Sequence, residues 1–147
     1  MNNKAKYTAV ALIFIWIGFV SSISFMEAWL KFRAPGLTLP VGLSVGKLIF
    51  TGLNRVEWIF ALLIGVCLVL GKRMGLKSKN ILFYLALIIL ALHTAWLLPA
   101  LNSRADIIIS GNQAGSSYLH VYYVGFELIK LSFLAIFGIR LLKTNTI

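Results

Sequence analysis

Carboxylate and imidazole side chains lie within long apolar runs of this 147-residue chain, where ionisable groups are unexpected. Three of its four carboxylates, Glu27, Glu57 and Glu127, fall in or at the ends of these runs, and so do its only histidines, His93 and His120. A charged side chain near the centre of a bilayer costs about 2.5–3.5 kcal/mol on insertion scales, so such groups usually face other helices and have partners. These five residues are the first candidates for chemistry.

The candidates fall at two depths when the helical rise is counted from the basic end of each run. Glu57 lies about 21 Å, and His93 and Glu127 about 20 Å, above that end. Glu27 and His120 lie at about 30 Å, near the outer interface. We therefore expect Glu57, His93 and Glu127 at one level, in the outer half of the membrane.

Helical spacing extends each candidate into a polar stripe on one face of its helix. The stripes are Ser24, Glu27 and Lys31; Lys47, Phe50, Asn54 and Glu57; His93, Trp96, Ala100 and Arg104; and His120, Tyr123, Glu127 and Lys130. If all four faces turn inward, they enclose a polar cavity that opens outward. Asn54, Arg104, Glu27 and His120 are expected at its rim.

Three kinds of site are compatible with Glu57, His93 and Glu127. They could bind a small ligand or a proton-coupled ion, or the same three could hold a metal ion such as iron, zinc, manganese or copper. They could also be structural ion pairs, Glu127 with Lys130 and Glu57 with Arg55 or Arg104. Against metal, the Glu-x-x-His repeat of di-metal helical proteins is absent.

Haem is disfavoured as a cofactor, because the two histidines differ in predicted depth by roughly 10 Å and axial ligands must face each other.

The composition identifies the elements that position these residues as membrane helices. Hydrophobic residues make up 60% and charged residues 12% of the chain, whereas soluble domains have about 45–50% and about 25%. Since each span needs about 20 apolar residues, we expect one all-α domain, an integral membrane four-helix bundle in the lipid bilayer. The predicted spans are 7–28, 48–71, 81–101 and 120–142.

Two span boundaries have alternatives. The second helix could begin anywhere from residue 41 to residue 55, because residues 42–54 could also form a separate interfacial segment. The first run could be a cleavable signal peptide, but hydrophobicity resumes directly after Ser22, which favours a retained helix. Pro35 and Pro40 are expected to end that helix.

The net charge of +10 reports topology rather than nucleic-acid binding. Eight of the fourteen basic residues lie before the first run, between the second and third, and after the fourth, which is the same side in a four-span protein. They are Lys4, Lys6, Lys72, Arg73, Lys77, Lys79, Arg140 and Lys143. The positive-inside rule then places both termini in the cytoplasm and the protein in the cell (inner) membrane. The lone Cys67 excludes an internal disulfide and thiol redox relays that need two cysteines.

Tyrosines and tryptophans gather toward the outer ends of the runs, as in an interfacial aromatic belt. They are Trp29, Trp58, Trp96, Tyr118, Tyr122 and Tyr123. Gly42 and Gly46 form one GxxxG pair, a spacing that permits close helix contact.

Several short segments resemble the transmembrane protein 205-like family of small four-span membrane proteins. They are Gly18 in a first helix leading to FMEAWLKFRAP, then GLSVGKLIF leading to LNRVE, and WLLPALNSRAD. The resemblance implies a four-helix membrane domain and no particular activity. The layout is also similar to anthrone-oxygenase-like four-span proteins, which would imply an enzyme acting on a lipophilic aromatic.

These observations favour a membrane protein that binds a small ligand or ion without covalent catalysis. The first alternative is a membrane-embedded oxidoreductase that uses a metal or acts on a lipophilic aromatic. The second is a non-catalytic accessory subunit of a larger membrane complex, or an oligomer.

Overall fold

The computed structural model describes residues 3–72 and 80–143, and the chain is all-α and 88% helical. Three of the basic residues used to orient the chain, Arg73, Lys77 and Lys79, lie outside the described residues. The helices form four long segments, separated by the two short connections 34–38 and 110–118 and by the stretch that contains residues 73–79.

The first segment runs without a break from Asn3 to Arg33. It consists of α1 (Asn3–Ser21), a π-helical stretch (Ser22–Glu27), the short α2 (Ala28–Leu30) and a 3-10 turn (Lys31–Arg33). It ends where Ala34, which precedes Pro35, adopts an extended conformation. Gly36 then takes a φ of 80°, which glycine adopts without steric cost.

The second segment is the single helix α3 (Leu39–Leu70), which begins earlier than the predicted span at 48–71. Pro40 lies in its first turn, where a missing N–H leaves no helical hydrogen bond unmade. The proline therefore starts this helix, and residues 42–54 form its first half rather than a separate interfacial segment.

The third segment continues to Ile109, beyond the predicted end near residue 101. It consists of α4 (Ile81–Leu92), a π-helical stretch (His93–Leu97) and α5 (Leu98–Ile109). Pro99 lies inside this segment and would clash with a carbonyl four residues earlier in a regular helix. The wider turn before it, closed by a hydrogen bond from the N–H of Leu98 to the carbonyl of His93, accommodates the proline.

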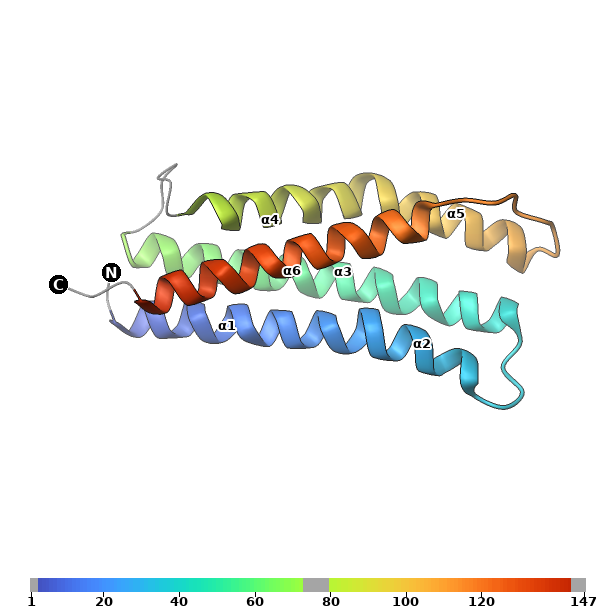
Figure 1. The fold of residues 1–147 in the computed structure, drawn as a ribbon, viewed down its shortest axis with the longest axis horizontal. Coiled ribbons are helices and arrows are strands. Elements are labelled where there is room, and N and C mark those ends of the chain that lie inside the picture. Colours follow the sequence, from blue (N-terminus) through green and yellow to red (C-terminus); the bar gives the residue numbers. More distant parts are fainter. Residues whose placement is uncertain (1–2, 73–79, 144–147) are drawn as a thin grey trace.

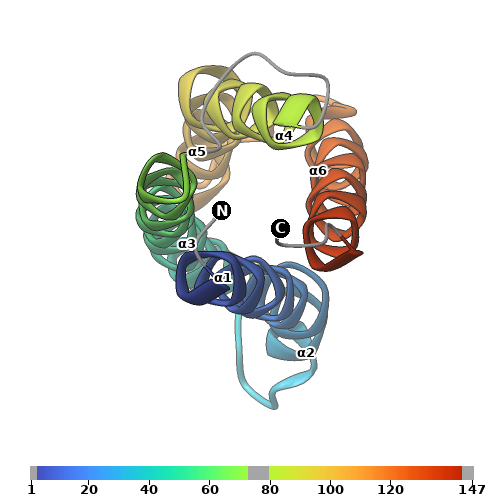
Figure 2. The same cartoon turned by 90° about the vertical axis from the view of Figure 1, so that its left-hand side faces the viewer.

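The fourth segment, α6 (Leu119–Lys143), closes the arrangement. Viewed from one end, the segments surround a common axis in the order α1, α3, α4 with α5, and α6 (Figure 2). Helix α1 packs against α3 and α6, and the third segment packs against α6 through α4 and against α3 mainly through α5. The start of α1 and the end of α6 lie together at what we call the proximal end (Figure 1). Connections 34–38 and 110–118 form the distal end.

Large apolar side chains lie on the outside of the molecule as well as in its core. Leu48, Leu62 and Leu70 are 76%, 68% and 71% exposed, whereas Ile13 and Ile64 are fully buried. Soluble proteins rarely expose so much contiguous apolar surface. The first three segments are long and apolar enough to cross a membrane, which confirms the prediction of long apolar helices.

Candidate functional site

The carboxylate of Glu57 joins three helices in the middle of the molecule. Glu57 lies on α3, and its side chain is 1% exposed. Its Oε2 accepts a hydrogen bond of 3.0 Å from the indole Nε1 of Trp16 on α1, and the same oxygen forms an ion pair with the ammonium of Lys130 on α6. Among the described residues its other oxygen, Oε1, has no hydrogen-bond partner.

The ammonium of Lys130 lies between two carboxylates. Besides Glu57, it contacts Oε1 of Glu127, one helical turn earlier on α6, at 2.9 Å. Neither Lys130 nor Glu127 is exposed. A buried charge without a partner is strongly unfavourable, so this lysine and the two carboxylates depend on one another.

His93 completes the group from the third segment. Its Nδ1 lies 3.2 Å from Oε2 of Glu127, which is close enough for an ion pair. The two atoms are not aligned for a hydrogen bond. The imidazole stacks on the ring of Tyr123, with 4.4 Å between ring centroids and 15° between planes. We call Glu57, His93, Glu127 and Lys130 the buried cluster.

The buried cluster is electrically neutral only when it holds one proton beyond the ammonium of Lys130. Two carboxylates and one ammonium leave one uncompensated negative charge while His93 is uncharged. A proton on the imidazole or on a carboxylate removes it. Because a net charge in a low-dielectric interior is costly, the arrangement favours binding of a single proton.

A second polar contact joins α3 to the third segment beside the cluster. The hydroxyl of Thr94 accepts hydrogen bonds of 3.0 Å from Nδ2 of Asn54 and from the indole Nε1 of Trp58. Thr94 also donates to the carbonyl of Leu90 at 2.8 Å, within its own helix. The predicted rim residue Asn54 therefore pairs between helices and is only 7% exposed.

The other predicted rim residues are separated from the buried cluster. Glu27 forms an ion pair of 3.6 Å with Lys31. Arg104 donates to the backbone carbonyls of Ala114 and Gly115 in the distal connection. The ion-pair partner of Glu57 is Lys130. The predicted pairing of Glu57 with Arg55 or Arg104 is therefore wrong.

A cavity of about 180 Å³ lies at the distal end, between the first segment, α3, α5 and α6. We call it the distal cavity. Its lining residues are Lys31, Phe32, Gly42, Leu43, Gly46, Lys47, Phe50, Leu98, Leu101, Asn102, Ala105, His120 and Tyr123. The predicted rim residue His120 belongs to this lining. Tyr123 lines the cavity and also stacks on His93, so one ring separates the cavity from the buried cluster.

Sequence reasoning missed some of these contacts. Trp16 was not singled out, although an indole N–H at the depth of a buried carboxylate is a donor that could have been considered. Tyr123 is 4% exposed and stacks on His93, so its assignment to the interfacial belt is wrong, whereas its place on the inward-facing polar stripe agrees with the structure. Trp29, Trp96 and Tyr118 are 55%, 50% and 73% exposed, and their place in a belt stays a prediction.

The donor set of the cluster does not fit a metal ion. Within residues 3–72 and 80–143, no three His, Cys, Asp or Glu side chains are grouped so that they could hold one. The ammonium of Lys130 already lies between Glu57 and Glu127, where it would repel a metal cation.

No protein-family model, curated protein or solved structure matches the chain.

Proposed function

We propose that the chain is a multi-pass membrane protein that binds one exchangeable proton in the buried cluster and a small ligand in the distal cavity above it. We further propose that it lies in the cell (inner) membrane with both termini in the cytoplasm. Support comes from the three apolar segments and from basic side chains at the proximal end, among them Lys72 and Lys143. This proposal is one of binding rather than covalent catalysis.

The observation that carries the proposal is the position of Tyr123. Its ring lines the distal cavity and lies flat against the imidazole of His93. A charged or polar ligand in the cavity is therefore separated from His93 by the ring of Tyr123 alone, and its electric field changes the proton affinity of His93. Because His93 and Glu127 are paired, the field of the ligand and the protonation of the cluster are linked, and each alters the affinity for the other.

The proposal is tested by nitrogen NMR of the histidine side chains in protein labelled with ¹⁵N-histidine. The variant His120→Gln leaves His93 as the one imidazole of the chain. We expect its two ring signals to change with pH, and we expect Glu127→Gln to alter that titration. Lys143→Met, which removes an exposed charge at the proximal end away from the cluster and the cavity, is the control and should leave it unchanged.

Signals of His93 that stay constant over the whole pH range in which the protein is folded would contradict the proposal. The buried cluster would then be a set of structural ion pairs that pin the order of the helices.

A further inference from the structure

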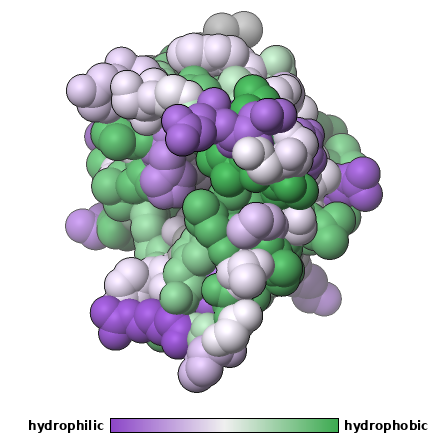
Figure 3. All heavy atoms as spheres, turned by 90° about the vertical axis from the view of Figure 1, so that its right-hand side faces the viewer, coloured by the Kyte–Doolittle hydropathy of each residue, from purple (hydrophilic) through white to green (hydrophobic). Residues whose placement is uncertain are grey.

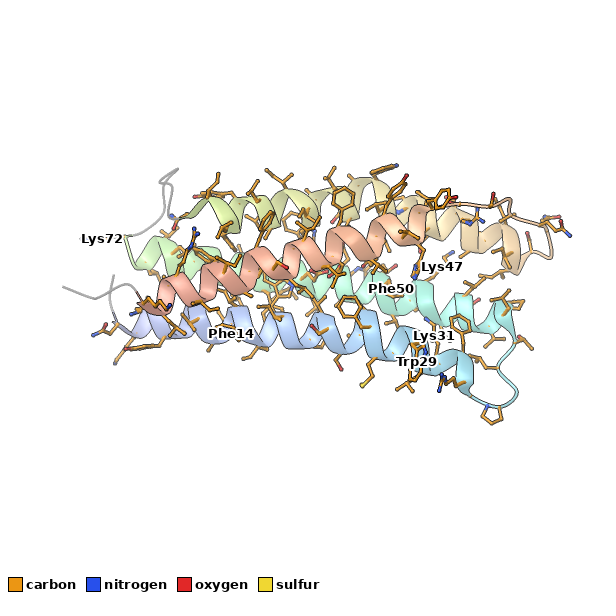
Figure 4. All side chains as sticks on the ribbon, viewed as in Figure 1. Phe14, Trp29, Lys31, Lys47, Phe50 and Lys72 are labelled. Atoms are coloured by element: carbon orange, nitrogen blue, oxygen red, sulfur yellow. The ribbon has the colours of Figure 1, made fainter. Side chains whose placement is uncertain are left out.

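Cationic and aromatic side chains share the lining of the distal cavity. Lys31 comes from the 3-10 turn at the end of the first segment, Lys47 from α3 and His120 from α6. Figure 4 shows Lys31, Lys47 and Phe50 gathered in the same distal part of the molecule. Seen from the distal end, hydrophilic side chains gather among hydrophobic ones (Figure 3).

The ammonium of Lys31 has room at the cavity wall because Gly46 of α3 has no side chain. A Cβ added at Gly46 would lie 2.8 Å from Nζ of Lys31, and one added at Gly42 would lie 2.5 Å from the ring of Phe32. These glycines, the GxxxG pair of the sequence, therefore admit Lys31 and Phe32 to the cavity wall. The pair serves a contact of α3 with the first segment at its distal end.

The two lysines have partners that leave room for an anion. Nζ of Lys31 lies 5.5 Å from the ring centroid of Phe50, and its ion pair with Glu27 is long, at 3.6 Å. The partner of Lys47 is Asp106, whose side chain is 60% exposed and so lies at the rim. Both ammonium groups thus retain donors for a further carboxylate, since each has three N–H bonds.

The floor of the cavity is aromatic. Phe50 and Tyr123 meet edge to face, with 5.6 Å between ring centroids. The cavity volume of about 180 Å³ is close to that of an apolar cavity of about 150 Å³ that holds benzene. An apolar body of about the size of one ring therefore fits on this floor.

A second hollow of the molecule lacks the cations that line the distal cavity. It lies on the side of α3 that faces α4, and its lining residues are Trp58, Ala61, Leu62, Gly65, Val66, Val69, Leu70, Phe83 and Leu87. None of these is charged, as expected of a surface that faces lipid tails.

We propose that the distal cavity binds a small organic carboxylate with a compact apolar body, the carboxylate at Lys31 and Lys47 and the body on Phe50 and Tyr123. This inference rests on the proposed function, because it names the class of ligand that the cavity takes. A carboxylate satisfies two cations by charge-assisted hydrogen bonds, which are about twice as strong as neutral ones.

Benzoate is a suitable probe, with the full-length protein in nanodiscs of zwitterionic lipid and binding measured by calorimetry. We expect benzoate to bind at one saturable site per chain. Benzyl alcohol keeps the ring but lacks the charge, and acetate keeps the charge but lacks the ring. Each should bind at least about tenfold more weakly, the loss expected for about 1.4 kcal/mol of interaction.

The variant Gly46→Ala tests the position of the carboxylate, because its Cβ would displace the ammonium of Lys31. Gly52→Ala is the matched control on the same helix, since nothing lies within 4 Å of its added Cβ. We expect about tenfold weaker benzoate binding in Gly46→Ala and in Lys31→Met, and wild-type binding in Gly52→Ala. Equal affinity in Gly46→Ala and Gly52→Ala, or equal affinity for benzoate and benzyl alcohol, would overturn the inference.

Competition with palmitate identifies the source of the carboxylate. Displacement of benzoate by palmitate supports a fatty acid, and a lack of displacement supports a water-soluble acid. Both outcomes keep the carboxylate at Lys31 and Lys47, and displacement by palmitate would overturn the compact apolar body. If benzoate does not bind the wild-type protein, but the NMR signals of His93 still change with pH and Glu127→Gln still alters that change, the inference about the ligand fails. In that case the proposed proton site stands.

Discussion

Lys130 of α6 and Glu57 of α3, 73 residues apart in the chain, form an ion pair in which both side chains are at most 1% exposed. The pair fixes α6 against α3 across the axis of the molecule, and Trp16 of α1 bonds the same carboxylate oxygen. Trp16 and Lys130 therefore both donate to one buried carboxylate oxygen, and the loss of Glu57 would leave both donors without this acceptor.

Replacing Lys130 should destabilise the protein strongly. Lys130→Met leaves Glu57 and Glu127 buried without their cation, and we expect a loss of about 3–5 kcal/mol in unfolding free energy. Thermal or denaturant unfolding in mild detergent measures it. Lys143→Met, at an exposed position on the same helix, should change the stability little. A loss as small as that of the control would show that the buried pairing contributes nothing.

The indole N–H of Trp16 should contribute separately from the packing of its ring. Trp16→Phe keeps an aromatic ring against Phe60, which stacks on Trp16 with 6.2 Å between centroids, but removes the donor to Glu57. We expect a loss of about 1.5–3 kcal/mol, as for hydrogen bonds to charged groups. Trp96→Phe, at a residue that is 50% exposed, is the control in the same unfolding assay and should be nearly neutral.

The close approach of α1 to α6 depends on Gly138. A Cβ there would lie 3.2 Å from both the Cγ2 of Ile13 and the ring of Phe14. Gly138→Val should therefore cost about 1–3 kcal/mol through overpacking. Gly125→Val is the matched variant on the same helix, where nothing lies within 4 Å of the added Cβ. Unfolding midpoints that move equally in both variants would contradict this contact.

The proposed orientation can be tested by labelling single cysteines with a membrane-impermeant maleimide in intact cells. On a Cys67→Ala background, Ser116→Cys in the distal connection should be labelled from outside. Lys143→Cys at the proximal end should be labelled only after the membrane is permeabilised. The reverse pattern would show that the positive-inside rule fails for this chain.

The sequence predicted the convergence of Glu57, His93 and Glu127, because rise per residue fixes depth once the apolar runs are placed. The structure does bring these three side chains together, joined by Lys130. It also confirms a long all-α chain with apolar helices. That Glu57, His93 and Glu127 form a functional site stays a prediction, and so does the resemblance to the transmembrane protein 205-like family.

What could not be predicted depends on which helices become neighbours and on local backbone irregularities. Arg104 has the same charge as Lys130 and shares a predicted face with His93, so sequence alone gave no reason to prefer Lys130 as the partner of Glu57. Pro40 reads as a helix breaker until its place in the first turn of α3 is known. The only sequence feature that points to the π-helical stretch His93–Leu97 is Pro99, which follows it and cannot continue a regular helix without a local irregularity.

Infrared difference spectroscopy across a pH titration tests the central claim, that the buried cluster exchanges one proton, most directly. The wild-type protein should show the protonation of one buried carboxyl or imidazole. The double variant His93→Gln with Glu127→Gln should lose this signal, and Glu27→Gln should keep it. A difference spectrum that is the same in the wild-type protein and in the double variant would contradict the account.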